Sequence, residues 1–214
     1  MQRTVEQTDD GSATLFVPEL NEHYHSVKGA RTESLHIFIH MGLRAVSANS
    51  PRVLEIGFGT GLNALLTLEA AEADKRSVHY TGIELYPLAW EEVEILNYSN
   101  HPSFKTLHSS PWEKEVPITP YFTLKKTEID ARMMINTKHS FDVIYFDAFA
   151  PEKQPELWDE ELFRNLYSSL APGGVLTTYC SKGVIRRILQ SVGFKVERLP
   201  GPPGGKREII RASK

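Results

Sequence analysis

A short glycine-rich segment directly after an apolar strand is the feature of this sequence that most limits its fold. Val53-Leu54-Glu55-Ile56 predicts a buried strand, Gly57, Gly59 and Gly61 follow at alternate positions, and a helical pattern begins at Leu62. Glycines at such a turn let the backbone approach a ligand closely, because a Cβ atom there would occupy the ligand's place. The alternative is that the glycines only allow a helix to pack closely on a sheet. We expect a strand-turn-helix unit with a nucleotide-like ligand at the turn.

The spacing of these residues distinguishes between kinds of nucleotide site. The order Glu-x-Gly-x-Gly-x-Gly differs from the G-x-G-x-x-G of dinucleotide-binding proteins, and no Lys follows the glycines as it does in a phosphate-binding P-loop. Glu84 ends the next apolar strand, where a carboxylate can accept two hydrogen bonds from a ribose. Asn63 either contacts the amino-acid end of a cofactor or caps its own helix. Together with Glu55, this combination resembles the S-adenosylmethionine site of Rossmann-like methyltransferases.

The rest of the sequence alternates between strand and helix patterns, which is typical of α/β proteins. Such alternation favours a mostly parallel sheet with helices on both faces. We expect a Rossmann-like, seven-stranded sheet that ends in an antiparallel C-terminal hairpin. The predicted strands are 52–56, 78–83, 121–126, 142–146, 174–179, 194–199 and 206–211, and the predicted helices are 61–72, 87–98, 131–136, 159–169 and 183–191.

The first part of the chain is expected to be an extension of this domain. Residues 1–50 predict a hairpin, with strands at 14–17 and 23–26, and then a helix over 31–46. Residues 51–214 hold the methyltransferase-like pattern, and a length of 214 residues suits one α/β folding unit overall. The proline-rich segment 101–120 predicts a loop.

Composition and charge exclude several classes of protein. The sequence has no apolar run long enough to cross a bilayer and no apolar segment at its start, so we expect a soluble, cytoplasmic protein without membrane contact. Cys180, the single cysteine, excludes an intramolecular disulfide or a cysteine-based zinc cluster, and no metal is expected. The net charge is −3, yet residues 182–214 hold nine Lys and Arg against two Glu. This basic segment indicates either a contact with phosphates or an ordinary solvated surface.

A second set of chemically useful residues is expected at the same edge of the sheet. The apolar strand that ends at Phe146 delivers Asp147 to its carboxyl end, and ligands of open α/β sheets bind beside the carboxyl ends of strands. A carboxylate there can accept the N–H groups of an amine, orient its lone pair and receive a proton. Asp147 is therefore the candidate base beside the cofactor, unless it is a turn or cap residue before Pro151. Phe149 either contacts the acceptor or packs in the loop.

With these residues in place, nearly the whole chain resembles the methyltransferase domain of the MnmC type, which acts on tRNA wobble uridines. The most specific part of the resemblance is the long segment after the fourth predicted strand, which is similar to the family pattern D-x-F-A-P-x-K-N-P-x-x-W. The segments that carry it are Tyr24-His25-Ser26, Glu33-Ser34, Glu55 to Asn63, Glu84, Asp147-Ala148-Phe149-Ala150-Pro151-Glu152-Lys153-Gln154-Pro155-Glu156-Leu157-Trp158, and Gly205-Lys206-Arg207-Glu208.

The resemblance implies an enzyme that uses S-adenosyl-L-methionine and releases S-adenosyl-L-homocysteine. Its expected reaction converts 5-aminomethyl-(2-thio)uridine at the tRNA wobble position to 5-methylaminomethyl-(2-thio)uridine, with Asp147 orienting or deprotonating the amine. Glu84 and Asp130 would hold the adenosine, and Tyr24 and Ser26 would also lie at the cofactor. For Asp130, capping of the helix that follows is an equal alternative.

The same resemblance implies a macromolecular partner, the anticodon stem-loop of tRNA. Lys153, Lys206 and Arg207 are the candidate phosphate contacts, with exposure to solvent or an internal pair with Glu208 as the alternative. Trp158 is expected in the core. Bifunctional relatives carry a fused flavin oxidase domain that generates the amine, and this chain has no room for one, so a separate enzyme is expected to supply the substrate.

Three other functions are compatible with parts of the pattern. An aminopropyltransferase would use a similar sheet and carboxylate, but those enzymes have a second Asp three residues beyond the first, where this chain has Ala150. A methyltransferase of a small-molecule amine would share every cofactor residue. A catalytically inactive S-adenosylmethionine-binding or RNA-docking module would bind the cofactor without transferring its methyl group.

Overall fold

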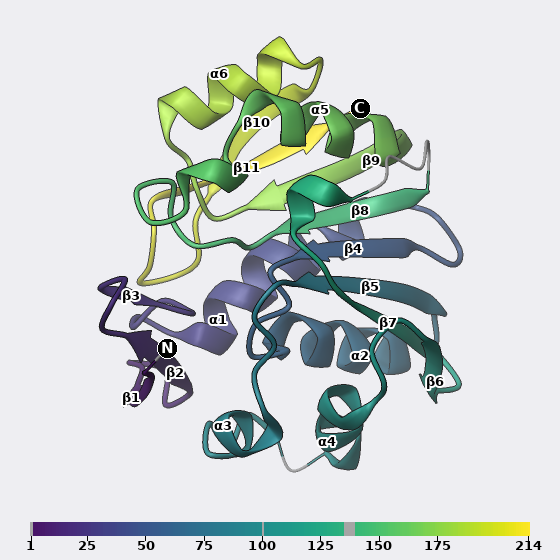
Figure 1. Ribbon diagram of the computed structural model, residues 1–214. Helices are drawn as coiled ribbons and strands as arrows, with labels where there is room; N and C mark the ends of the chain where they lie inside the picture. Colours follow the sequence, from purple (N-terminus) through teal and green to yellow (C-terminus); the bar gives the residue numbers. More distant parts are fainter. Residues whose placement is uncertain (1, 100, 135–139) are drawn as a thin grey trace.

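A large mixed β-sheet lies at the centre of the computed structural model, which describes residues 2–99, 101–134 and 140–214 (Figure 1). Its strands are β4 (Arg52–Ile56), β5 (Val78–Glu84), β6 (Glu115–Thr119), β7 (Phe122–Glu128), β8 (Phe141–Phe146), β9 (Leu170–Thr178), β10 (Lys195–Pro200) and β11 (Glu208–Ser213). They lie in the order β10-β11-β9-β8-β4-β5-β7-β6. The five strands from β9 to β7 are parallel, whereas β6, β10 and β11 each run antiparallel to a neighbour.

Helices cover both faces of this sheet because its central strands are apolar on both sides. In β4, Val53 points to one core and Leu54 to the other. The first core contains α2 (Leu62–Asp74) and α4 (Pro102–Ser109), and the second contains α5 (Glu160–Ser169) and α6 (Gly183–Ser191). The short helix α3 (Trp90–Glu94) lies beside α4 (Figure 1). Trp158 and Cys180 are each 4% exposed in the second core, so the predicted core position of Trp158 is confirmed.

The N-terminal segment forms a small sheet and an interrupted helix. The strands β1 (Thr4–Gln7), β2 (Ala13–Val17) and β3 (Glu22–His23) pair in sequence order. Helix α1 (Ala30–Ser34) continues into a π-helical segment over Leu35–His40 and a 3₁₀ turn over Leu43–Ala45. Figure 1 shows the small sheet on the side toward which β4, β5 and β8 point. The N-terminal segment therefore lies where ligands of an open α/β sheet are expected.

The predicted Rossmann-like α/β fold is confirmed, with several local corrections. The sheet has eight described strands instead of seven, because β6 forms in the segment predicted as a loop. The N-terminal hairpin gains β1 as a third strand, and the expected helix over 31–46 is interrupted. The helix predicted over 87–98 is limited to α3. The helix predicted over 131–136 is a 3₁₀ turn at Ala131–Met133, and its last two residues lie outside the described part of the chain.

The buried residues of the N-terminal helix share one core with β4 and α2. Ile37, Phe38 and Ile39 are each at most 2% exposed, so this segment packs firmly on the central sheet. The division of the chain at residue 50 stays a prediction. Among the described residues, no helix combines the length and apolar composition that a bilayer crossing requires.

Candidate functional site

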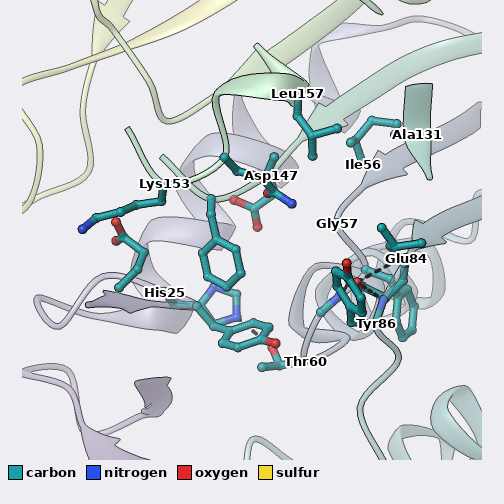
Figure 2. Close-up of a pocket in the computed structure, with 18 of the residues that line it drawn as sticks. His25, Ile56, Gly57, Thr60, Glu84, Tyr86, Ala131, Asp147, Lys153 and Leu157 are labelled. Atoms are coloured by element: carbon teal, nitrogen blue, oxygen red, sulfur yellow. Dashed lines mark hydrogen bonds between the residues drawn. The ribbon is translucent and has the colours of Figure 1, made fainter. Parts of the chain in front are cut away.

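The candidate site lies where the chain leaves β4 between its two neighbouring strands. The amides of Gly57 and Phe58 both donate to the Ile83 carbonyl at 3.0 Å, and the Asp147 amide donates to the Ile56 carbonyl at 3.0 Å. The tips of β4, β5 and β8 are therefore fixed to one another. A cavity of about 580 Å³ opens beside them, a size typical of small-molecule sites (Figure 2).

The three glycines of the turn make room for protein atoms. Gly57 has a φ of 90°, and a Cβ atom there would lie 2.8 Å from the Asp147 carbonyl oxygen. A Cβ atom on Gly61 would lie 2.6 Å from His108 Nε2, and one on Gly59 would lie 3.2 Å from the Tyr24 ring. The glycines are thus explained in part by close packing of protein atoms, which is the alternative to close approach of a ligand. The turn brings the backbone of β8 against that of β4 at the cavity.

Glu84 is held at the cavity wall by backbone amides. Its Oε1 atom accepts hydrogen bonds from the Leu85 and Tyr86 amides at 2.9 Å, and its Oε2 atom accepts one from the Gly59 amide at 2.9 Å. Figure 2 shows Glu84 and Tyr86 together at one end of the cavity, away from Lys153. The Glu84 carboxylate is therefore fixed in place at the tip of β5, as a ribose-binding role requires.

Asn63 connects two carboxyl groups that come from different strands. Its Nδ2 atom donates to Glu55 Oε1 and to Asp147 Oδ2, both at 2.8 Å. Gly61 takes the N-cap position of α2 without a side-chain cap, so Asn63 does not cap its own helix. Within the described part of the chain, Asn63 Oδ1 is buried and has no hydrogen-bond partner. The Asn63 side chain is thus oriented by β4 and β8 and has one acceptor free.

Burial changes the acidity of both carboxyl groups. Burial raises the pKa of Asp147 to about 7, with the Asn63 hydrogen bond opposing this shift and the Glu33 carboxylate adding to it. Burial also raises the pKa of Glu55, which is 0% exposed, well above its usual range. Burial therefore favours the neutral form of Glu55, and Asp147 is close to half ionised at pH 7. Asp147 is thus suited to exchange a proton at physiological pH.

We expect Glu55→Gln to be more stable than the parent at pH 8 and to lose this advantage toward pH 5. Above the ordinary glutamate pKa the unfolded chain releases a proton that buried Glu55 retains, so the stability of the parent falls as pH rises. Gln keeps the acceptor for Asn63 and has no proton to release. Melting temperatures of both proteins between pH 5 and 8 measure this difference. Parallel pH profiles would contradict it, and Glu55→Ala, which removes the acceptor, should be about 1–3 kcal/mol less stable than Glu55→Gln at either pH.

Aromatic side chains form another part of the cavity wall. The rings of Tyr24 and Phe149 meet edge to face with centroids 5.1 Å apart, and both residues line the cavity. Trp158 Nε1 donates to the Phe149 carbonyl at 2.8 Å, which fixes the loop after β8. Ser26 also lines the cavity, and its amide donates to Glu33 Oε2 at 3.2 Å. Phe149 therefore packs in its loop and is still available to an acceptor.

Asp130 lines the cavity, but its side chain already has local partners. Its Oδ1 atom accepts from the Arg132 amide at 2.9 Å, and its Oδ2 atom forms an ion pair with Arg132 Nη2 at 2.5 Å. The capping role, one of the two alternatives, is therefore observed. A contact between Asp130 and adenine stays a prediction.

The predicted basic residues lie in three different settings. Lys153 lines the cavity, on the far side of Asp147 from Glu84 in the view of Figure 2. Lys206 also lines it, and its Nζ lies 3.4 Å from Glu33 Oε1. Arg207 is exposed and does not line the cavity. The internal pair with Glu208, one of the alternatives for this segment, is not the pair that Lys206 forms, because its partner is Glu33. Several other basic residues of the C-terminal segment have internal ion pairs, namely Lys182 with Glu152, Arg198 with Glu208, and Arg211 with Glu197.

Several cavity residues carry no predicted role. His25 Nε2 shares a hydrogen bond of 2.7 Å with Thr60 Oγ1, and burial lowers the pKa of His25 to about 4, so the ring is neutral. Glu33 enters the cavity from α1, and Tyr179 enters it directly after β9. Tyr179 directly follows β9, which neighbours β8. Its position at the end of this strand is the one feature of the sequence that could have predicted it as a site residue. Glu33 has no comparable local signal.

The fold and the cavity together define a class of protein. The glycine turn follows β4, and the fixed carboxylate of Glu84 lies at the tip of the neighbouring parallel strand β5. Together with the free buried acceptor on Asn63, these groups fit the ribose and amino-acid ends of S-adenosyl-L-methionine. This arrangement is that of a Rossmann-like methyltransferase.

The family follows from a comparison with known families. A family model described as S-adenosyl-L-methionine-dependent methyltransferase matches residues 97–214, which is more than half of the chain. The chain therefore belongs to this family, and its cofactor is S-adenosyl-L-methionine.

Curated relatives carry a more specific name. The chain is 31% identical to the tRNA 5-methylaminomethyl-2-thiouridine biosynthesis bifunctional protein MnmC of Cupriavidus necator over 216 residues, covering 92% of this chain and 32% of that protein. It is 29% identical to the protein of that name from Delftia acidovorans, covering 98% of this chain and 35% of that one. The chain thus spans about a third of the length of these curated relatives.

Solved structures with a similar fold include one of the same type of domain. The crystal structure of MnmC2 from Aquifex aeolicus is 28% identical, with a TM-score of 0.78 over 99% of this chain and 70% of that one. Spermidine synthase from Thermotoga maritima has a TM-score of 0.60 at 17% identity, over 99% of this chain and 72% of that one, which is a likeness of fold alone. The predicted resemblance to MnmC-type methyltransferase domains is confirmed.

Proposed function

We propose that this protein is an N-methyltransferase that converts 5-aminomethyl-(2-thio)uridine at the wobble position of tRNA to 5-methylaminomethyl-(2-thio)uridine. The observation that carries the proposal is the position of Asp147. Its carboxylate is held by Asn63 at the tip of β8, against the glycine turn after β4. The names of the MnmC relatives, which match most of this chain, supply the class of acceptor.

Residues of this chain provide a place for each part of the cofactor. Glu84 would accept hydrogen bonds from the ribose, the free Oδ1 atom of Asn63 would accept one from the amino group, and the wall that contains Asp130 would contact the adenine. Tyr24 and Ser26 would close the cavity over it. When bound, S-adenosyl-L-methionine supplies a methyl group that a neutral amine can attack at carbon.

Asp147 would act on the acceptor amine. An alkylammonium group has no lone pair, so one proton must leave before its nitrogen becomes a nucleophile. An ionised Asp147 can accept that proton, and the raised pKa, about 7, makes it a better base than an ordinary aspartate. The Asn63 hydrogen bond holds the second oxygen of the carboxylate, so the orientation of the amine is set by the fold.

Binding of tRNA would involve the rim of the cavity. Lys153 lies at this rim, and exposed Arg207 lies in the loop between β10 and β11. Phosphate contacts of this kind position a nucleic acid without reading its sequence. We propose the anticodon stem-loop as the part that enters, with Phe149 facing the uracil and a separate enzyme supplying the 5-aminomethyl group.

Incubation with methyl-labelled S-adenosyl-L-methionine tests the proposal. The acceptors are tRNA that carries 5-aminomethyluridine, the same tRNA without the modification, and a panel of small primary amines. Label recovered as 5-methylaminomethyluridine from the first tRNA alone is the expected result. Label in the small amines alone would replace the proposal with a small-molecule methyltransferase, and cofactor binding without transfer to any acceptor would indicate a non-catalytic module.

A further inference from the structure

An ammonium group of the protein itself lies inside the candidate site. Lys206 comes from the loop between β10 and β11, and its side chain reaches into the cavity that Asp147 also lines. Its Nζ lies 3.7 Å from the centre of the Tyr179 ring and 3.4 Å from Glu33 Oε1. A ring face and a carboxylate at these distances are the two kinds of partner that bind an alkylammonium ion.

The two partners of Lys206 are fixed by the fold. Glu33 lies on α1 with a side chain that is 12% exposed, and its other oxygen accepts from the Ser26 amide at 3.2 Å. Tyr179 donates its hydroxyl hydrogen to the Ala148 carbonyl at 2.9 Å, one residue after Asp147. The carboxylate and the ring therefore keep their positions whether or not a lysine lies between them.

Lys206 itself is held much less firmly. Its side chain is 42% exposed and belongs to a loop that contains Gly204 and Gly205. Exposed ion pairs contribute little to stability, so this lysine can leave without disturbing the core. The Glu33 charge raises the pKa of Asp147 and the Lys206 charge lowers it, because both charges lie close to the candidate base.

We propose that Glu33 and the Tyr179 ring form a subsite for the primary ammonium group of the acceptor, and that Lys206 occupies this subsite until the acceptor displaces it. The charged form of the amine binds between Glu33 and Tyr179 and then passes its proton to Asp147. The proposal rests on the proposed function, because it assigns the part of the same cavity that recognises the amine before transfer.

This proposal differs from a phosphate-binding role for Lys206 in a measurable way. A lysine that contacts tRNA phosphate helps the acceptor to bind, whereas a lysine that fills the ammonium subsite competes with the acceptor. Lys206→Met removes the charge at nearly constant length. We expect it to lower KM for tRNA bearing 5-aminomethyluridine by about threefold to tenfold. A higher KM would overturn the proposal.

Substitutions of the two fixed partners complete the kinetic test. Glu33→Gln keeps an acceptor for the Ser26 amide and removes the charge, and we expect KM to rise about tenfold with less change in kcat. Tyr179→Phe keeps the ring and should keep the KM of the parent, whereas Tyr179→Leu removes the ring and should raise KM. Lys195→Ala, an exposed lysine of β10 outside the cavity, is the control and should match the parent. An unchanged KM in both Glu33→Gln and Tyr179→Leu would overturn the subsite.

A binding measurement keeps the subsite testable even if the proposed tRNA reaction fails. The probes are 5-aminomethyluracil and its neutral analogue 5-hydroxymethyluracil, titrated by ligand-observed NMR into protein loaded with S-adenosyl-L-homocysteine. We expect the amine to bind more tightly than the alcohol, more tightly still to Lys206→Met, and no better than the alcohol to Glu33→Gln. Equal binding of both probes to the parent and to Lys206→Met would overturn the subsite. If tRNA is not methylated but the protein still binds the amine more tightly than the alcohol, only the proposed substrate is overturned.

Discussion

Asp147→Asn is expected to lower the rate of methyl transfer about 10²–10⁴-fold and to leave the affinity for S-adenosyl-L-methionine largely unchanged. The Asn side chain can still accept the hydrogen bond that Asn63 donates to Asp147, so the tips of β4 and β8 should keep their arrangement. The variant lacks the negative charge that is proposed to receive the proton of the amine. Single-turnover transfer to tRNA bearing 5-aminomethyluridine gives the rate, and calorimetric titration gives the cofactor affinity.

The pH dependence of the same reaction provides a second measurement. Burial raises the pKa of Asp147 to about 7, so its base form increases as pH rises through 7. The parent rate should therefore rise up to about pH 7 and level off above it, whereas the residual rate of Asp147→Asn should keep rising through pH 8, because without the base only an amine that is already neutral can react. Glu152→Gln, an exposed acid in the same loop, is the control and should behave as the parent. An unchanged rate in Asp147→Asn would remove Asp147 from the reaction.

Glu84→Ala is expected to weaken binding of S-adenosyl-L-methionine by about 10²–10³-fold, because hydrogen bonds to a charged group contribute about 1.5–3 kcal/mol each. The substitution removes the proposed ribose contacts and also frees the amides of Gly59, Leu85 and Tyr86. Titration of the cofactor measures the loss. The transfer rate at saturating cofactor should fall far less than it does in Asp147→Asn.

A matched control lies on the neighbouring strand. Glu128 is in register with Glu84 at the end of β7, is exposed and does not line the cavity. Glu128→Ala should bind the cofactor as the parent does. If both variants lose affinity equally, the effect comes from the charge at this edge of the sheet, and the assignment of Glu84 to the ribose is wrong.

The positions in the fold that the sequence predicts correctly are those that local patterns determine. The glycines and Asp147 follow the apolar strands β4 and β8, and Glu84 is the last residue of the apolar strand β5. Since parallel strands end at one edge of a sheet, the positions of these residues relative to one another follow from the strand assignments. In the structure Gly57, Gly59, Glu84 and Asp147 line one cavity, whereas Gly61 does not.

The subsite around Lys206 could not be predicted in the same way. Glu33, Tyr179 and Lys206 come from an N-terminal helix, a strand end and a loop near the C-terminus, and their meeting depends on how these segments pack. The sequence gives the charge of Lys206 but not its partner, so a phosphate contact and an internal pair with Glu208 fit the sequence equally well.

Errors in the predicted elements have similar causes. The strand β6 has a half-exposed pattern and contains Pro117, so its sequence lacks the apolar alternation of a strand. It forms because it can pair with the edge of β7. The helix expected from Pro87 begins at Trp90 instead, because Ala89 is extended and the Glu92 side chain accepts a hydrogen bond from its amide. Tertiary pairing and capping decide these two elements.

The contact between Gly57 and Asp147 also restricts how the protein can be redesigned. The backbones of the two residues lie so close that a single added methyl group at position 57 would displace Asp147, the residue proposed to receive the acceptor. Directed evolution toward new amines should therefore hold both positions constant and diversify Phe149 and Tyr24, whose rings can be replaced without moving either strand. Libraries that vary position 57 should yield almost no active clones, whatever amine is used for selection.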